Sequence, residues 1–176
     1  MLRVPKPSPR NEGTFKWILN PTAGHRDMQD ATWYCDGRLM HGTCKPYRAT
    51  GFGVVVVSRG GELLGFGFGT PPSRIATAAA AELWALRFVL SLNPFPPKVK
   101  TYCQSIISAA RRGTSAVTHH SRQHARVRTE IAEFVGGDVS SLVTDGLLVW
   151  VPAHLTLAAV GEARLGDGEQ ACGDTR

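Results

Sequence analysis

Glu82 is the ionisable residue whose surroundings in the sequence are the most unusual. In a helix, residues three, four and seven positions away share its face, and all of these are apolar: Ile75, Ala78, Ala79, Ala85, Leu86 and Val89. A carboxylate within such a stripe loses several kcal/mol of solvation unless a partner compensates for it. We therefore expect Glu82 to be a metal ligand or an acid–base group, or else to be satisfied by solvent at an edge or by a backbone amide.

Asp36 is the second carboxylate of interest, because it ends a predicted strand. Asp36 followed by Gly37 is, by itself, an ordinary turn signal. Together with Glu82, it would supply two carboxylates from different elements, which suits a hard cation such as Mg²⁺. A pair of Mg²⁺ ions can catalyse phosphodiester cleavage, but it needs further carboxylates. The neighbouring parallel strand ends at Tyr102, and a phenol is uncharged at neutral pH and a poor ligand for Mg²⁺.

A basic segment lies between residues 111 and 129. It contains no acidic residue, three histidines and five arginines: Arg111, Arg112, Arg122, Arg126 and Arg128. Such a segment can bind phosphates without regard to base sequence and with a strong dependence on salt. The alternative is a solvated helix face, which is what a run of charge usually is. The formal net charge of +6 suits an anionic partner, nucleic acid first, but also solubility alone.

The four cysteines are widely spaced and include no C-x-x-C pair, so they indicate neither a zinc ribbon nor a redox motif. Cys35, His41 and Cys44 could be a fragment of a metal site, although chance explains their spacing better. No apolar stretch has the length of a signal peptide core or of a membrane span. We therefore expect an intracellular protein with no membrane partner, in the nucleus or in the cytoplasm.

Strands and helices follow one another in an order that would position these residues. Strands over 31–39, 52–58 and 62–69 predict an antiparallel meander. A helix over 75–92, a strand over 98–102, helices over 103–113 and 121–135, and an apolar strand over 146–154 follow. This order predicts an α/β fold with a mixed sheet. We assign 1–30 to an N-terminal extension that we expect to be poorly ordered, 31–156 to one folded domain, and 157–176 to a Gly-rich C-terminal tail.

The ordered set of motifs resembles the ribonuclease H family, type 1, in the form carried by retroelements. The matching segments are YCDGR, ATGFGVVV, AAAAELWAL, TYCQSI and VWVPAHLT, which lie between Thr32 and Thr156 in the order of the family. The resemblance implies a ribonuclease H-like fold, in which a five-stranded sheet of three antiparallel and two parallel strands is flanked by helices on both sides. It also implies endonucleolytic cleavage of RNA in RNA–DNA hybrids with Mg²⁺ or Mn²⁺, within a larger retroelement polyprotein.

The resemblance also assigns roles to individual residues. Asp36 and Glu82 match catalytic metal ligands, and His154 matches the histidine of a flexible loop that helps product release or proton transfer. Tyr102 stands where the family has the catalytic Asp shared between the two ions. The family's last Asp lies on a C-terminal helix, for which this sequence has no counterpart.

Two departures from the family pattern therefore concern catalysis. Glu162 and Asp167 are nearby acids, but they lie in the Gly-rich tail and are not assigned to the site. We interpret the site as decayed or repurposed, with cleavage weakened or lost. The alternatives are a non-catalytic nucleic-acid-binding module of retroelement origin, an error in the sequence at Tyr102, or a fragment without a stable fold.

Overall fold

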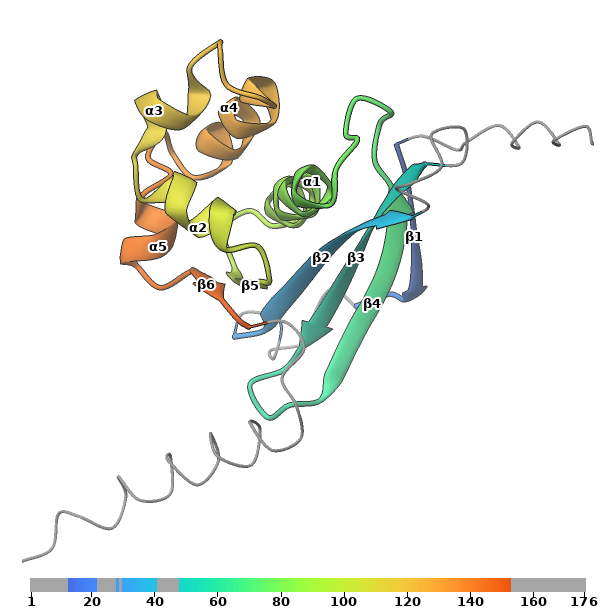
Figure 1. Ribbon diagram of the computed structural model, residues 1–176. Coiled ribbons are helices and arrows are strands. Elements are labelled where there is room, and N and C mark those ends of the chain that lie inside the picture. The colour runs from blue at the N-terminus through green and yellow to red at the C-terminus, as the bar shows by residue number, and fades with distance from the viewer. Residues whose placement is uncertain (1–12, 22–27, 29, 41–47, 153–176) are drawn as a thin grey trace, which may run out of the picture.

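Three antiparallel strands form the centre of the computed structural model, which describes residues 13–21, 28, 30–40 and 48–152 (Figure 1). They are β2 (Thr32–Met40), β3 (Ala49–Val57) and β4 (Leu63–Thr70), and they pair as the predicted meander. Side chains alternate along β2, so that Trp33 and Cys35 are buried under the helices while Asp36 is exposed. The alternation therefore places Asp36 on the sheet face that points away from the helices.

Two parallel strands extend the meander and confirm the mixed sheet. Strand β5 (Lys98–Thr101) runs parallel to β2, and β6 (Leu148–Trp150) runs parallel to β5. Cys35 pairs with Thr101, which in turn pairs with Trp150. Tyr102 directly follows β5, whereas Asp36 lies in the middle of β2, which continues to Met40, and does not end its strand as predicted.

The sheet has six strands and not the predicted five, because residues assigned to the N-terminal extension form β1 (Thr14–Leu19). The strand order is β1-β4-β3-β2-β5-β6, and β1 pairs antiparallel with β4. Phe15 of β1 covers the surface that Gly67 of β4 leaves open, where a Cβ atom would come within 2.6 Å of the Phe15 ring. The register shifts between Trp17 and Leu19, which marks an irregularity near the end of this edge strand.

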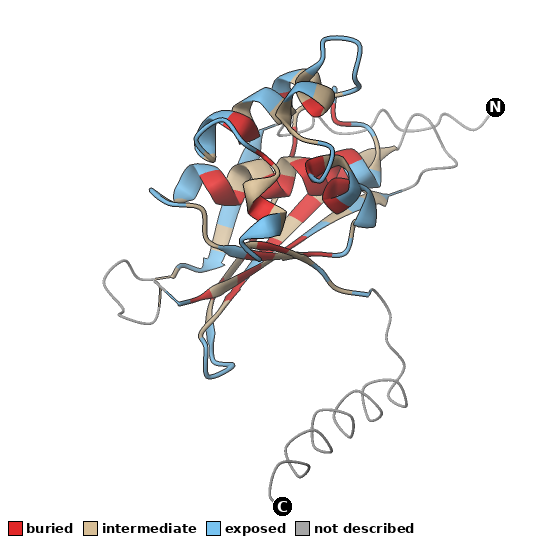
Figure 2. Ribbon diagram, turned by 90° about the vertical axis from the view of Figure 1, so that its left-hand side faces the viewer, coloured by how far each residue is buried: buried red, intermediate tan, exposed pale blue. Residues whose placement is uncertain are grey.

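Five helices follow the meander: α1 (Ala78–Leu92), α2 (Gln104–Ala110), α3 (Thr114–Thr118), α4 (Ala125–Phe134) and α5 (Ser141–Thr144). Helix α1 begins three residues later than predicted because Thr77 caps it, accepting a hydrogen bond from the Ala80 N–H at 3.1 Å. In the described part of the chain, these helices lie on one face of the sheet, whereas the resemblance implied helices on both (Figures 1 and 2).

The hydrophobic core lies between the sheet and α1. Val54 and Val56 of β3 face Leu86 and Val89 of α1, and all four are almost completely buried. Figure 2 shows the buried residues concentrated along this interface. Among the described helices, none combines the length and the apolar character that crossing a bilayer requires. The core thus holds α1, which carries Glu82, over β2 and β3.

Candidate functional site

Glu82 lies on the buried face of α1, with only 5% of its surface exposed, and is satisfied by the chain that follows β5. Its Oε1 accepts hydrogen bonds from Thr101 Oγ1 at 2.5 Å, from the Tyr102 N–H at 2.7 Å and from the Cys103 N–H at 2.8 Å. The backbone amides of Tyr102 and Cys103 therefore compensate the buried carboxylate, which is one of the alternatives that we expected for Glu82 from the sequence. Glu82 therefore fastens α1 to the junction between β5 and α2.

Burial raises the pKa of Glu82 above its ordinary value, and the three hydrogen bonds oppose this rise. The charge of Asp36 raises the pKa of Glu82 further. Burial also raises the pKa of the Cys35 thiol, and the charges of Glu82 and Asp36 add to that effect. Asp36 thus acts on Glu82 through its charge from the outer face of the sheet, whereas Glu82 lies on the helical face.

Gly37 explains how closely α1 approaches β2. A Cβ atom at this position would collide with the backbone of Glu82, Ala81 and Ala78. Helix α1 consequently packs directly against the backbone of β2, one residue beyond Asp36. Asp36 is exposed on the outer face of the sheet, where it lines a shallow hollow with Arg38, Gly53 and Phe68.

Tyr102, which stands where the resemblance implies a third ligand, is held through its backbone. Its N–H donates to Glu82, and its carbonyl accepts a hydrogen bond from the Trp150 indole N–H at 3.1 Å. The phenol itself is 39% exposed. These hydrogen bonds thus fix the backbone of Tyr102, and its side chain is accessible to solvent at the end of β5.

The donor set does not fit the two-ion site that the resemblance implies. Within the described ranges, no cluster of three or more His, Cys, Asp or Glu side chains is placed to hold a metal ion. One oxygen of Glu82 already accepts three hydrogen bonds, and a phenol occupies the position of the third carboxylate. His154 lies outside the described residues, as do His41 and Cys44.

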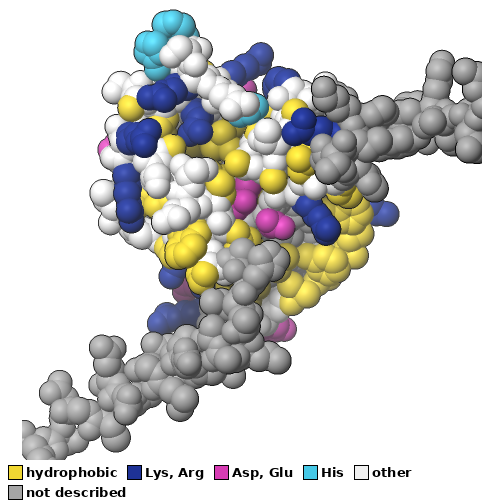
Figure 3. Space-filling model, viewed as in Figure 1, with side chains coloured by type: hydrophobic (Ala, Val, Ile, Leu, Met, Phe, Trp, Pro, Cys, Tyr) yellow, Lys and Arg dark blue, Asp and Glu magenta, His cyan; other side chains and the backbone are white. Residues whose placement is uncertain are grey.

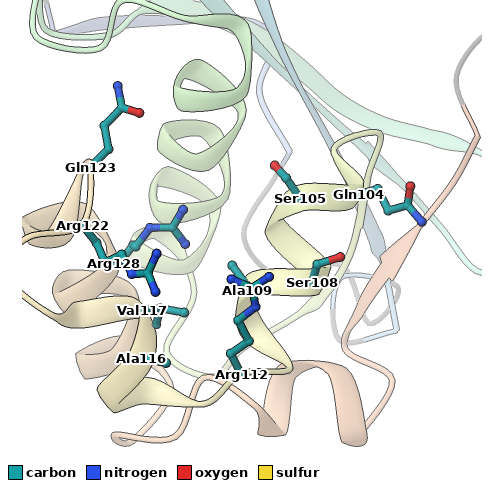
Figure 4. A pocket seen from close by; sticks show the side chains of 10 residues that line it. All are labelled: Gln104, Ser105, Ser108, Ala109, Arg112, Ala116, Val117, Arg122, Gln123 and Arg128. Carbon is teal, nitrogen blue, oxygen red and sulfur yellow. The ribbon is translucent and has the colours of Figure 1, made fainter.

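Three of the five predicted arginines converge on one groove. Arg112, Arg122 and Arg128 line a groove of about 530 Å³ between α2 and the segment that carries α3 and α4 (Figure 4). We call it the arginine groove. Its other lining residues are Gln104, Ser105, Ser108, Ala109, Ala116, Val117 and Gln123. Figure 3 shows that Lys and Arg side chains gather over the helical part of this face, apart from the acidic side chains near its centre.

The arginine groove holds positive charges close together without a carboxylate among its lining residues. Burial lowers the pKa of Arg128, and the charge of Arg122 lowers it further. Burial likewise lowers the pKa of His124, to which the charges of Arg128 and Arg74 contribute. A bound anion would relieve this repulsion, so the groove is suited to phosphate groups.

The other two predicted arginines lie outside the lining of the groove. Arg126 is 84% exposed at its side chain and bonds Glu130 at 3.3 Å, and Glu130 also bonds Arg87 at 2.8 Å. Arg111 is exposed and follows α2. The sequence analysis did not single out Gln104 or Trp150. The only available signal for Gln104 was its position in the TYCQSI motif.

The chain was compared with known proteins. No protein-family model and no curated protein matches it. Solved structures do. RNase H1 from the halophilic archaeon Halobacterium salinarum is 20% identical, with a TM-score of 0.50 over 70% of this chain and 86% of that one.

Two foamy viral structures are also similar. A foamy viral protease-reverse transcriptase in complex with dsDNA is 14% identical, with a TM-score of 0.54 over 80% of this chain and 90% of that one. The same kind of protein in complex with an RNA/DNA hybrid is 15% identical, with a TM-score of 0.50 over 90% of this chain and 22% of that one. With this order of strands and this helical layer, the chain has a ribonuclease H-like fold.

Proposed function

We propose that this ribonuclease H-like domain binds duplex nucleic acid, RNA–DNA hybrids first, and that its metal-dependent cleavage of the RNA strand is weakened or lost. The observation that carries the proposal is the state of Glu82, whose Oε1 is bonded to the β5–α2 junction beside a tyrosine in the third ligand position. The arginine groove, which Gln104 at the start of α2 also lines, has no acidic lining residue.

Loss of cleavage follows from the number of carboxylates. Two-ion hydrolysis needs several carboxylates, at least one of them shared between the ions, to hold both ions against their mutual repulsion. Asp36 and Glu82 are the two candidate carboxylates, and the charge of Asp36 raises the pKa of Glu82. With Tyr102 in place of a shared acid, Mg²⁺ or Mn²⁺ has no bridging ligand, and we derive no catalytic step through a metal.

Binding follows from the arginine groove. Guanidinium groups pair well with phosphate oxygens, and they would bind a backbone without reading its bases. A hybrid would then be recognised by its shape and its 2′-hydroxyl groups. The similar foamy viral proteins were solved with dsDNA and with an RNA/DNA hybrid, which supports the choice of ligand and an origin in a larger retroelement polyprotein.

A cleavage assay with Tyr102 variants tests the proposal. A labelled RNA–DNA hybrid is incubated with Mg²⁺ or Mn²⁺ and with the native chain, Tyr102→Asp or Tyr102→Asn, and Mn²⁺ binding is measured in parallel by calorimetry. We expect the native chain and Tyr102→Asn to bind the hybrid without cleaving it. Tyr102→Asp should gain affinity for Mn²⁺ that the Asn variant lacks, because only Asp adds a charge.

Efficient cleavage by the native chain would show that the argument about Tyr102 is wrong. Absence of hybrid binding by all three proteins, each shown to be folded by cooperative thermal unfolding, would refute the binding function.

A further inference from the structure

We propose that the preferred ligand carries an unpaired stretch, whose bases stack on Tyr102 and Trp150 while its phosphates follow the arginine groove. This inference rests on the proposed nucleic-acid function and names the class of nucleic acid that it takes. We call Tyr102 and Trp150 the aromatic pair. An aromatic surface beside a basic groove is the usual arrangement of proteins that bind single strands.

Both members of the aromatic pair are open to solvent. Tyr102 is 39% exposed and Trp150 is 42% exposed. They lie at the ends of neighbouring strands, since Thr101, directly before Tyr102, pairs with Trp150. Large aromatic surfaces contribute most to the energy of a core or an interface, so two exposed aromatic residues that are joined by the hydrogen bond from the Trp150 indole to the Tyr102 carbonyl indicate a contact site.

Hydrogen bonds fix the backbone and the indole of the aromatic pair. The Trp150 indole N–H donates to the Tyr102 carbonyl at 3.1 Å, and the Val151 N–H donates to the Thr101 carbonyl at 2.9 Å. On its other side, the Tyr102 N–H donates to Glu82 at 2.7 Å. A ligand that binds here does not need to order the junction first, which favours affinity.

The aromatic pair adjoins the arginine groove through α2. Gln104 lies two residues after Tyr102, begins α2 and lines the groove together with Ser105 and Ser108. Figure 4 shows Gln104 on the side of α2 that faces β6, Arg112 beside Ala109 at the other end of α2, and Arg122 and Arg128 across the groove. A strand that leaves the arginines along α2 therefore arrives at Tyr102 and Trp150.

A fully paired duplex cannot use the aromatic pair in this way. Its bases are stacked on one another, and a protein ring reaches their faces only where a strand is unpaired. The phosphates of either form can occupy the arginine groove. The groove thus provides general affinity, and the aromatic pair selects an overhang, a gap or a free single strand.

Fluorescence anisotropy with three labelled probes tests the inference: a single-stranded oligonucleotide, the same strand made abasic, and a blunt RNA–DNA hybrid. We expect the native chain to bind the base-bearing strand about 5- to 150-fold more tightly than the abasic strand, which is the range for one stacked base. Tyr102→Ala and Trp150→Ala should lower this ratio. Tyr102→Phe and Trp150→Phe, which keep a ring, should retain much of it.

Phe95→Ala is the matched control, because Phe95 is 80% exposed and precedes β5, at the opposite end of that strand from Tyr102. It should keep the native ratio. Tyr102→Ala removes none of the hydrogen bonds described above, since these involve the Tyr102 backbone, and it keeps the test valid if Trp150→Ala unfolds.

Equal binding of the base-bearing and abasic strands by the native chain would overturn the inference, and so would a native ratio in Tyr102→Ala. Salt-dependent binding of the blunt hybrid would in that case leave the proposed function standing. Failure to bind any of the three probes would overturn both.

Discussion

Replacing one arginine of the groove should change the salt dependence of binding by a defined amount. Arg122 lines the arginine groove, whereas Arg126 lies outside it, four fifths exposed and already bonded to Glu130. Arg122→Ala and Arg126→Ala remove the same charge from nearby positions in the chain. Only the first should reduce the number of phosphates that the protein neutralises.

The magnitude follows from the three arginines of the groove. If each neutralises one phosphate of a blunt hybrid, the slope of log K against log salt is about −2.7, and affinity falls about 40-fold between about 50 and 200 mM KCl. With Arg122 removed, the slope becomes about −1.8, and the same change in salt weakens binding only about 12-fold. Arg126→Ala should keep the native slope.

Anisotropy titrations of a labelled blunt hybrid at several KCl concentrations measure all three slopes, and thermal unfolding confirms that the variants are folded. Equal slopes for Arg122→Ala and the native protein would refute the assignment of the groove. A loss of slope in Arg126→Ala as large as that in Arg122→Ala would show that binding depends on total charge and not on the groove.

Three further predictions concern Glu82 and the packing of α1 around it. Glu82→Ala should cost at least about 2 kcal/mol, because the Thr101 hydroxyl and the Tyr102 N–H lose their acceptor, while the Cys103 N–H keeps only Thr101 Oγ1 at 3.2 Å. The native pKa of Glu82 lies above its unfolded value, so the native state binds more protons between the two. Stability should therefore fall as pH rises from about 4.3, less so in Glu82→Gln. Urea unfolding at several pH values measures the cost of Glu82→Ala and the pH dependence of stability. Parallel pH profiles for the native protein and Glu82→Gln would contradict the predicted pH dependence. Gly37→Ala should cost about 1–3 kcal/mol or more through its collision with the Glu82 backbone, whereas Gly53→Ala, with 3.9 Å to the Gly67 carbonyl oxygen, should change stability by less than about 1 kcal/mol. Equal unfolding free energies for these two variants would refute the close packing.

The strands of the meander, α1, β5 and β6 could be predicted because their residues repeat with the period of their element. Alternation in β2 puts Trp33 and Cys35 on one face and Asp36 on the other, and in the structure the first two are buried and Asp36 is exposed. Strand β1 was missed because its six residues stand next to a Pro- and Gly-rich stretch, and its inward side chains are only half-buried. Helices α3 and α5, with five and four residues, are too short to show a helical period.

The site could be predicted only in part, because its contacts join distant parts of the chain. The sequence identified Glu82 as a carboxylate that needs a partner. It could not identify the partner, since two of its three donors are backbone N–H groups 20 and 21 residues away. The sequence likewise located five arginines, but which of them line a common groove depends on how α2 and α4 pack. The aromatic pair depends on the register of β5 and β6 in the same way.

Strand β1 forms one edge of the sheet, where a strand of a second molecule could pair with it. In the described residues its strand partner is β4 alone, and Ile18 and Leu19 are 51% and 42% exposed along it. A regular apolar margin of this kind is a template on which a second molecule can add a strand. Here the register shift leaves Ile18 without a paired residue, which bends the margin and spoils its fit to a straight incoming chain. At the β1 edge, the irregular position at Ile18 therefore disfavours edge-to-edge pairing.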